Sequence, residues 1–161
     1  MRILVAVDES ENAQRAVNYV GSLLRGRPDV EITLFHVLKP MPRGLLEHGG
    51  SEDPAVEAQL SRQLHRDQEA WIRQETATEC PVLVKACEAL IESGWESTQV
   101  KLQIGHEDDV AGNILEEARN GKHDTIVVGR HGTSNAKGVF GGGVTDHILR
   151  GAKGMTVWVV E

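Results

Sequence analysis

The sequence contains few cysteines, few aromatic residues and no long hydrophobic run. Of its 161 residues 2 are cysteine and 4% are aromatic, whereas 40% are hydrophobic. A chain of that length and hydrophobic content can build one sizeable core without disulfides. The composition therefore excludes a mini-protein or a fibre, and we expect a single domain over 1–161.

The two cysteines are expected to be reduced thiols. Cys80 and Cys87 lie seven residues apart on a predicted helical stretch. That spacing puts them about two turns apart, too far for an unstrained disulfide. Cys87 also falls on an apolar helical stripe, so we expect it in the core.

Positive charge is also scarce. Lys and Arg number 17 against 24 Asp and Glu, giving a formal net charge of −7. A phosphate backbone would have to be held against that repulsion, which disfavours nucleic-acid binding.

The longest apolar stretches, such as 3–7 and 157–160, are far shorter than the roughly 20 residues of a membrane span. No membrane insertion is expected. The first residues also lack the apolar run and cleavage site of a secretory signal, so the expected location is cytoplasmic.

The apolar periodicity alternates between strand and helix. It predicts strands at 2–7, 30–38, 100–104, 125–128 and 155–160. Helices are predicted after Ser10, at 55–78, from Pro81 to Gly94, at 107–120 and at 144–149, with Cys80-Pro81 dividing the two middle helices. Such alternation predicts a doubly wound α/β fold, a parallel sheet with helices on both faces.

Two segments stand apart from this alternation. Residues 39–54 contain three prolines and three glycines, which predicts a loop able to cover a ligand. The strand at 100–104 has one polar face, which indicates an edge strand.

The two most informative loops are predicted to meet. Doubly wound folds bind ligands at the carboxyl ends of the strands, where the strand order reverses, here between the first and fourth strands. Asp8 ends the first strand and Gly129 ends the fourth. We therefore expect a ligand crevice between them.

The glycine-rich segment 129–143 precedes a predicted helix and suits an anionic guest. Glycine permits close backbone approach, and the N-terminus of a helix offers unpaired N–H groups to a phosphate. The alternative is that the glycines only form a surface loop. A P-loop is excluded because no G-x-x-x-x-G-K-[ST] string occurs, and Asp8-Glu9-Ser10 lacks the glycines of a dinucleotide fingerprint.

Taken together, these motifs resemble those of the universal stress proteins of the ATP-binding type. The family's nucleotide loop has the form G-x2-G-x9-G-[ST], and Gly129, Gly132 and Gly142 match its spacing. The resemblance extends over essentially the whole chain, through the segments 3–10, 35–37 and 157–160. It implies a Rossmann-like fold of the adenine nucleotide alpha hydrolase kind, with five parallel strands in the order 3-2-1-4-5.

The resemblance also implies a bound ATP or AMP. Adenine would lie against Val37 and the backbone of Ala6 and Val7, with the ribose near Asp8 and Gly129. The full predicted set is Ala6, Val7, Asp8, Val37, Val128, Gly129, Arg130, His131, Gly132, Gly142, Gly143, Val144 and Thr145. The phosphates would lie over the last five residues of this set, from Gly132 to Thr145. Mg²⁺ could arrive bound to the phosphates.

One position departs from the family pattern. Gly143 replaces the Ser or Thr that follows the last glycine, so one phosphate-binding hydroxyl is missing. A hydrogen bond to a charged group contributes roughly 1.5–3 kcal/mol, or about one to two decades of affinity. Unless Thr145 or water substitutes, we expect weaker binding or a preference for fewer phosphates.

Neither a catalytic centre nor a metal site is predicted. His131 could act as a base, but shaping the loop is its favoured role because no carboxylate partner is evident. The acids Glu107, Asp108 and Asp109 suit the first turn of a helix through its dipole. The histidines and cysteines lack zinc-site spacing.

Three functions remain open. The leading one is a dimeric, adenine-nucleotide-binding stress regulator that is not an enzyme and acts on an unknown protein partner. The resemblance implies that the homodimer forms through the last strand, between Met155 and Val160, where Trp158 could lie at the interface. The alternatives are a nucleotide-independent dimerisation module and a slow ATPase or phosphotransferase using His131 or Lys137.

Overall fold

The structure is a computed structural model that describes residues 1–39, 41–46, 49–106, 109–131 and 143–161. In chain order its elements are β1 (Arg2–Ala6), α1 (Glu11–Leu23), β2 (Glu31–Val37), η1 (Arg43–Leu45), α2 (Pro54–Glu92), η2 (Ser97–Gln99), β3 (Val100–Gly105), α3 (Val110–Asn120), β4 (Thr125–Gly129), α4 (Val144–Gly151) and β5 (Thr156–Val160).

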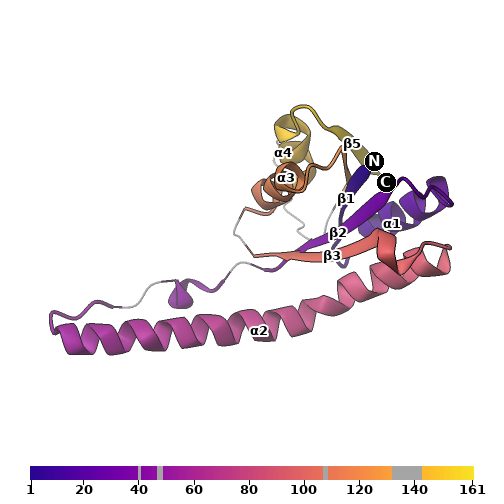
Figure 1. The fold of residues 1–161 in the computed structure, drawn as a ribbon. Coiled ribbons are helices and arrows are strands. Elements are labelled where there is room, and N and C mark those ends of the chain that lie inside the picture. Colours follow the sequence, from indigo (N-terminus) through magenta and orange to yellow (C-terminus); the bar gives the residue numbers. More distant parts are fainter. Residues whose placement is uncertain (40, 47–48, 107–108, 132–142) are drawn as a thin grey trace.

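The strands form one parallel sheet in the order β3-β2-β1-β4-β5 (Figure 1). This confirms the predicted doubly wound fold and strand order. The reversal point lies between β1 and β4, where Ile3 pairs with Thr125 and Val5 with Val127. β3 is an edge strand, as its polar face predicted.

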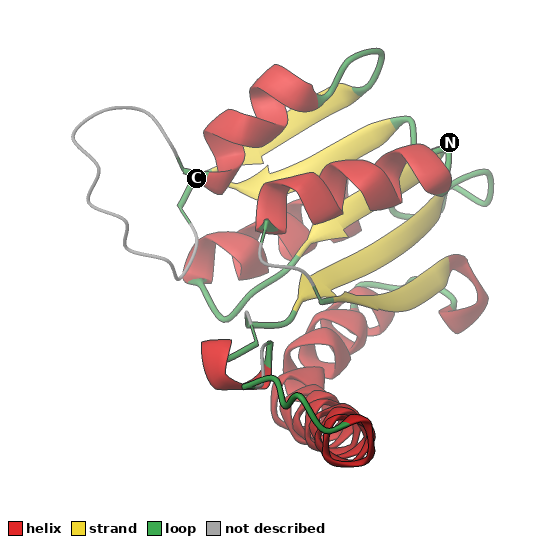
Figure 2. Cartoon of the chain, turned by 90° about the vertical axis from the view of Figure 1, so that its left-hand side faces the viewer, coloured by secondary structure: helices red, strands yellow, loops and turns green. Residues whose placement is uncertain are grey.

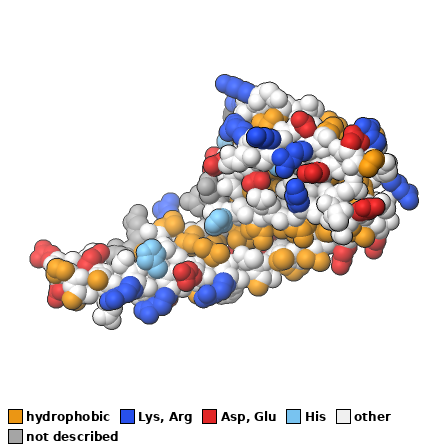
Figure 3. Space-filling model, viewed as in Figure 1, with side chains coloured by type: hydrophobic (Ala, Val, Ile, Leu, Met, Phe, Trp, Pro, Cys, Tyr) orange, Lys and Arg blue, Asp and Glu red, His pale blue; other side chains and the backbone are white. Residues whose placement is uncertain are grey.

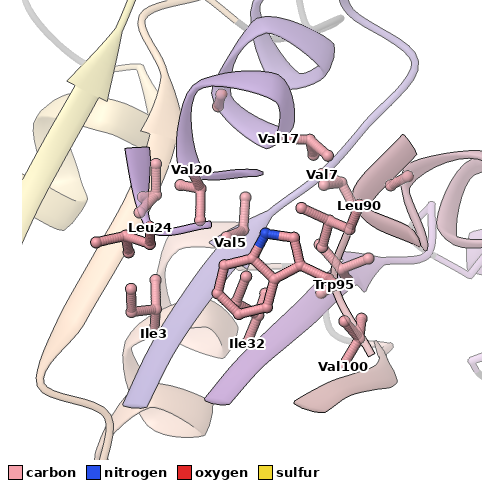
Figure 4. Close-up of a cluster of buried hydrophobic side chains, with 14 of the residues drawn as sticks. Ile3, Val5, Val7, Val17, Val20, Leu24, Ile32, Leu90, Trp95 and Val100 are labelled. Carbon is pink, nitrogen blue, oxygen red and sulfur yellow. The ribbon is translucent and has the colours of Figure 1, made fainter. Parts of the chain in front are cut away.

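Each face of the sheet carries its own apolar cluster. Residues of α1 and α2 cover one face and form the cluster around Trp95 shown in Figure 4. Trp95 donates its indole N–H to the carbonyl of Gly21 at 3.0 Å. Residues of α3 and α4 cover the other. Trp158 packs against the first cluster and Val157 against the second, so they lie on opposite faces of β5.

The prediction of two helices separated at Cys80-Pro81 is wrong. α2 is one helix of 39 residues with Pro81 inside it. Pro81 lacks the N–H that would bond to the carbonyl of Ala77, but proline is tolerated where packing holds the flanking turns. Here Leu83, Ala86 and Leu90 are buried on the sheet just after the proline.

The rest of α2 projects beyond the sheet. All its buried residues lie between Glu79 and Leu90. The preceding turns extend from the edge where the strands end, and Figure 2 views them nearly along their axis. The segment after β2 runs beside them, where Gln68 donates to the carbonyl of Leu45 at 2.7 Å and Glu57 accepts from the Ser51 N–H at 2.8 Å.

The two sides of α2 also differ in the type of side chain that they carry. In Figure 3 hydrophobic side chains gather along the line where this helix meets the body, while charged side chains occupy its outer edge. No described helix is long and apolar enough to cross a membrane.

Both cysteines are free thiols, as predicted. Cys87 is half-buried against the cluster beneath α1 and α2. Burial raises the pKa of its thiol, which disfavours the reactive thiolate. Its surroundings therefore suit a packing role.

Candidate functional site

The loop after β1 fixes Asp8 at the carboxyl edge of the sheet. Its Oδ1 accepts from the Ser10 N–H at 2.9 Å and from the Ser10 hydroxyl. The same hydroxyl oxygen caps α1 by accepting from the Ala13 N–H at 3.2 Å. A short polar loop, rather than glycines, thus turns the chain from β1 into α1 and orients the carboxylate.

Gly129 brings the end of β4 against this loop. A Cβ at this position would lie 2.8 Å from the Cβ and 2.9 Å from the carbonyl carbon of Asn12. Only glycine allows this close approach without displacing α1. Asn12 also donates from Nδ2 to the carbonyl of His131 at 3.2 Å, tying the two loops together. The ends of β1 and β4 therefore lie close together at this edge of the sheet.

The start of α4 forms the other side of the site. Gly143 is its N-cap, contributes no side-chain hydrogen bond, and has open space where a Cβ would stand. Thr145 donates its hydroxyl to the carbonyl of Gly129 at 3.0 Å. In this arrangement the Thr145 hydroxyl hydrogen holds α4 against β4 and is not directed at a phosphate.

The predicted apolar residues fall on two sides of the sheet. Ala6, Val37 and Val144 pack against the cluster beneath α3 and α4, which also contains Val128. Val7 belongs to the opposite cluster. The first three are half-buried on the α3 and α4 side of the sheet, and together they are called the apolar wall.

Arg130 turns away from this wall. Its Nη1 lies 2.7 Å from Glu161 Oε2, and its backbone N–H donates to the carbonyl of Val160 at 2.7 Å. The side chain is thus engaged at the C-terminal end of β5. His131 is exposed and meets the α1 side through its backbone carbonyl.

Gly132, Gly142 and Lys137 lie outside the described residues. The acids Glu107 and Asp108 do too, but Asp109 caps α3 by accepting from the Gly112 N–H at 3.0 Å, the helix-start role predicted for it. Within the described segments no group of three or more His, Cys, Asp or Glu residues could hold a metal ion.

A cavity of about 440 Å³ adjoins Asp8 between α1 and α2. Its lining combines apolar side chains with the acids Asp8, Glu9 and Glu11 and with Lys85. The sequence did not indicate this cavity, because α2 reaches the loop after β1 only through the tertiary packing. Asn12 was missed as well, since an asparagine in a first helical turn has no distinctive spacing.

Comparisons with known proteins agree with this architecture. The model of the Universal stress protein family matches residues 1–161. No curated protein matches the chain at a significant level.

Among solved structures, a universal stress protein in complex with cAMP is 18% identical, with a TM-score of 0.61 over 100% of this chain and 96% of that one. A family member from Arabidopsis thaliana with AMP bound is 19% identical, with a TM-score of 0.61 over 99% and 90% of the two chains. Universal stress protein UspA from Lactobacillus plantarum is 23% identical, with a TM-score of 0.59 over 100% and 97%.

At these identities the structural likeness shows the fold. The family model matches the sequence over its whole length, and this match is evidence of family membership that a shared fold does not provide. The chain therefore belongs to the universal stress protein family.

Proposed function

We propose that this protein is a regulator that binds ATP or AMP and does not turn the nucleotide over. The observation that carries the proposal is the convergence of Asp8 and Gly129 at the reversal point of the sheet, next to the N-terminus of α4. Ligands of doubly wound folds bind at this point. The family members in complex with cAMP and with AMP support an adenine nucleotide as the guest.

In this proposal each part of the crevice recognises one part of the nucleotide. The wall of Ala6, Val37 and Val144 offers the apolar surface that an adenine ring requires. The oriented carboxylate of Asp8 can accept hydrogen bonds from ribose hydroxyls, and Gly129 lets the end of β4 lie close against the start of α1 beside it. Backbone N–H groups at the start of α4 can hold phosphate oxygens.

Two further residues, Gly132 and Gly142, complete the proposed phosphate site by their family spacing. Mg²⁺ would enter only on the phosphates. Because Thr145 already donates to the Gly129 carbonyl, it does not replace the hydroxyl missing at Gly143. We therefore propose weaker phosphate binding than in relatives with Ser or Thr there.

We further propose a cytoplasmic homodimer that signals to a protein partner. The edge strand β5 offers the pairing surface, with Val159 41% exposed. Beside it Tyr19 and Trp158 meet edge to face at 6.2 Å between ring centroids. Nucleotide contact with the segment after β2 would then change the surface presented to the partner.

The first experiment identifies the bound ligand. Purified protein is denatured, released nucleotide is identified by mass spectrometry, and refolded apo protein is titrated with ATP, ADP and AMP while phosphate release is followed. Adenine nucleotide in near-equal ratio to protein, without phosphate release, is expected. Sustained release would favour the slow ATPase. No nucleotide and no binding heat would favour the nucleotide-independent module.

A matched pair of variants locates the site. Asp8→Asn removes the carboxylate proposed to hold the ribose and is expected to lower affinity by about one decade. Asp67→Asn makes the same change on the projecting part of α2 and should leave affinity unchanged. Equal affinities for the two variants would contradict the site.

A further inference from the structure

A polar cluster next to the proposed crevice joins the buried His36 and Glu79 to the exposed Lys39, and the proposed nucleotide contacts do not use it. His36 on β2 is 6% exposed, and its Nδ1 lies 2.8 Å from the carbonyl oxygen of Val7. A carbonyl oxygen only accepts hydrogen bonds, so Nδ1 carries a hydrogen and donates it to Val7.

The other ring nitrogen faces α2. His36 Nε2 lies 3.4 Å from Oε2 of Glu79, a residue that is 3% exposed. Within the described part of the chain Nε2 has no other group as a hydrogen-bond partner. Two acceptor atoms at this separation would repel, since burial of both side chains weakens screening by solvent. A hydrogen must therefore lie between them.

Lys39 decides where that hydrogen is. Its Nζ is paired with Oε1 of Glu79 at 2.5 Å and lies 3.9 Å from Glu75. The Glu79 carboxylate raises the pKa of Lys39, with smaller contributions from Glu75 and Glu9. A lysine cation favours the ionised carboxylate, so the hydrogen belongs on His36 Nε2. Glu79 then lies between the imidazole Nε2–H and the Lys39 ammonium group.

The cluster connects two parts of the molecule. Val7, held by His36, is the residue before Asp8, and its N–H donates to the Phe35 carbonyl at 2.9 Å. Glu79 is the first buried residue of α2, where the projecting part of this helix meets the sheet. One imidazole therefore contacts the strand end beside the proposed ribose site and the root of the long helix.

We propose that His36 is a positioning residue that joins the nucleotide crevice to α2, donating from Nδ1 to Val7 and from Nε2 to Glu79. This rests on the proposed function. Nucleotide bound at Asp8 stabilises the end of β1, and through the ring it stabilises the docking of α2. By reciprocity, docking of α2 strengthens nucleotide binding. The projecting helix thus reports occupancy to a partner.

Two substitutions of His36 separate its two bonds. Asn at this position has a donor near Nδ1, so His36→Asn keeps the bond to Val7 and loses the one to Glu79. Gln reaches farther, so His36→Gln keeps the contact with Glu79 and loses Val7. Affinity for ATP, ADP and AMP is measured by titration, and hydrogen exchange is followed over 79–90 with and without nucleotide.

Opposite effects are expected. His36→Gln should lower nucleotide affinity about tenfold and leave exchange over 79–90 near wild type. His36→Asn should keep the affinity within about threefold, speed exchange over 79–90 about tenfold, and abolish its slowing by nucleotide. A merely structural histidine would instead move both readouts together in both variants, and that result would overturn the proposal.

The ring hydrogens give a test that needs no nucleotide. Nitrogen NMR of His36 near neutral pH should show hydrogen on both ring nitrogens. In Glu79→Gln the side-chain amide donates to Nε2, so only Nδ1 should carry hydrogen. A bare Nε2 in the wild type would overturn the assignment. If the wild type binds no nucleotide, the proposed function fails. This NMR test, together with hydrogen exchange of His36→Asn without nucleotide, still decides whether His36 connects Val7 to Glu79.

Discussion

The two parts of α2 share one conformation and differ in what holds them. From Glu79 to Leu90 the helix buries four residues against the sheet and α1. Before Glu79 none of its residues is buried, and contacts come from the segment after β2. Helical structure by itself therefore does not show whether a segment belongs to the core.

Local chemistry supports the projecting part. Asp53 caps the helix by accepting from the Ala55 N–H at 2.9 Å, and Pro54 occupies the first helical position. Gln63 donates to Asp67 one turn on at 2.8 Å. Each such interaction contributes a few tenths to about 1 kcal/mol, whereas one buried leucine contributes several times more. The projecting part should open well before the rest unfolds.

The largest expected effect contrasts two leucines. Leu83→Ala removes a side chain that is 2% exposed and should lower the free energy of unfolding by about 2–5 kcal/mol. Leu60→Ala, at a residue 36% exposed, should lower it by less than about 1 kcal/mol. Urea denaturation measures both. Similar losses would mean that the projecting part is packed against something in solution.

Pro81 marks the border between the two parts. Pro81→Ala restores the N–H that can bond to the Ala77 carbonyl and should raise the free energy of unfolding by about 1–2 kcal/mol. Amide exchange just before residue 81 should slow as the projecting part becomes continuous with the docked part. Unchanged exchange there would show that the proline does not weaken the border.

We expect the loss of folding stability in acid to come from a histidine packed against the sheet rather than from the projecting part of α2. Burial lowers the pKa of His123, whose Nε2 lies 2.9 Å from Thr33 Oγ1. The unfolded state therefore binds the proton more readily, and stability falls as pH drops below about 6.5, by at most about 1.4 kcal/mol per pH unit. In His123→Gln the fall between about pH 6.5 and 5 should be shallower. An identical slope would assign acid sensitivity elsewhere.

The smallest effect is expected where the segment after β2 meets the projecting helix. Gln68→Ala removes the bond to the Leu45 carbonyl and should change the free energy of unfolding by less than about 1 kcal/mol. Hydrogen exchange over 43–46 should nevertheless become faster. Protection equal to wild type would show that this bond does not hold the segment.

The sequence was sufficient for the fold because each strand and helix shows its own periodicity. The alternation of strands and helices along the chain predicted a parallel sheet, and Asp8 and Gly129 were placed at its reversal point. The prediction failed at Cys80-Pro81, where local propensity favoured a break. Burial of Leu83 and Leu90 just beyond the proline outweighed that preference.

The sequence predicted which residues belong to the candidate site better than it predicted which groups those residues contact. A glycine at 129 suggested close approach, but only the structure shows that Asn12 is the group approached. Thr145 was expected near a phosphate, and only the structure shows that its hydroxyl donates to the Gly129 carbonyl. A hydroxyl donates to an acceptor that the fold places within reach, and for Thr145 that acceptor is a carbonyl from another part of the chain.

What the sequence determined by itself is the set of features encoded by short-range patterns: the elements, the family, the net charge and the glycine spacing. What only the tertiary structure decided is the pairing of groups far apart in the chain. His36 and Glu79 are separated by 43 positions, and no local pattern relates them. Their contact exists because β1, β2 and α2 meet at one edge of the sheet, and burial there leaves each polar atom only the partners that the fold provides.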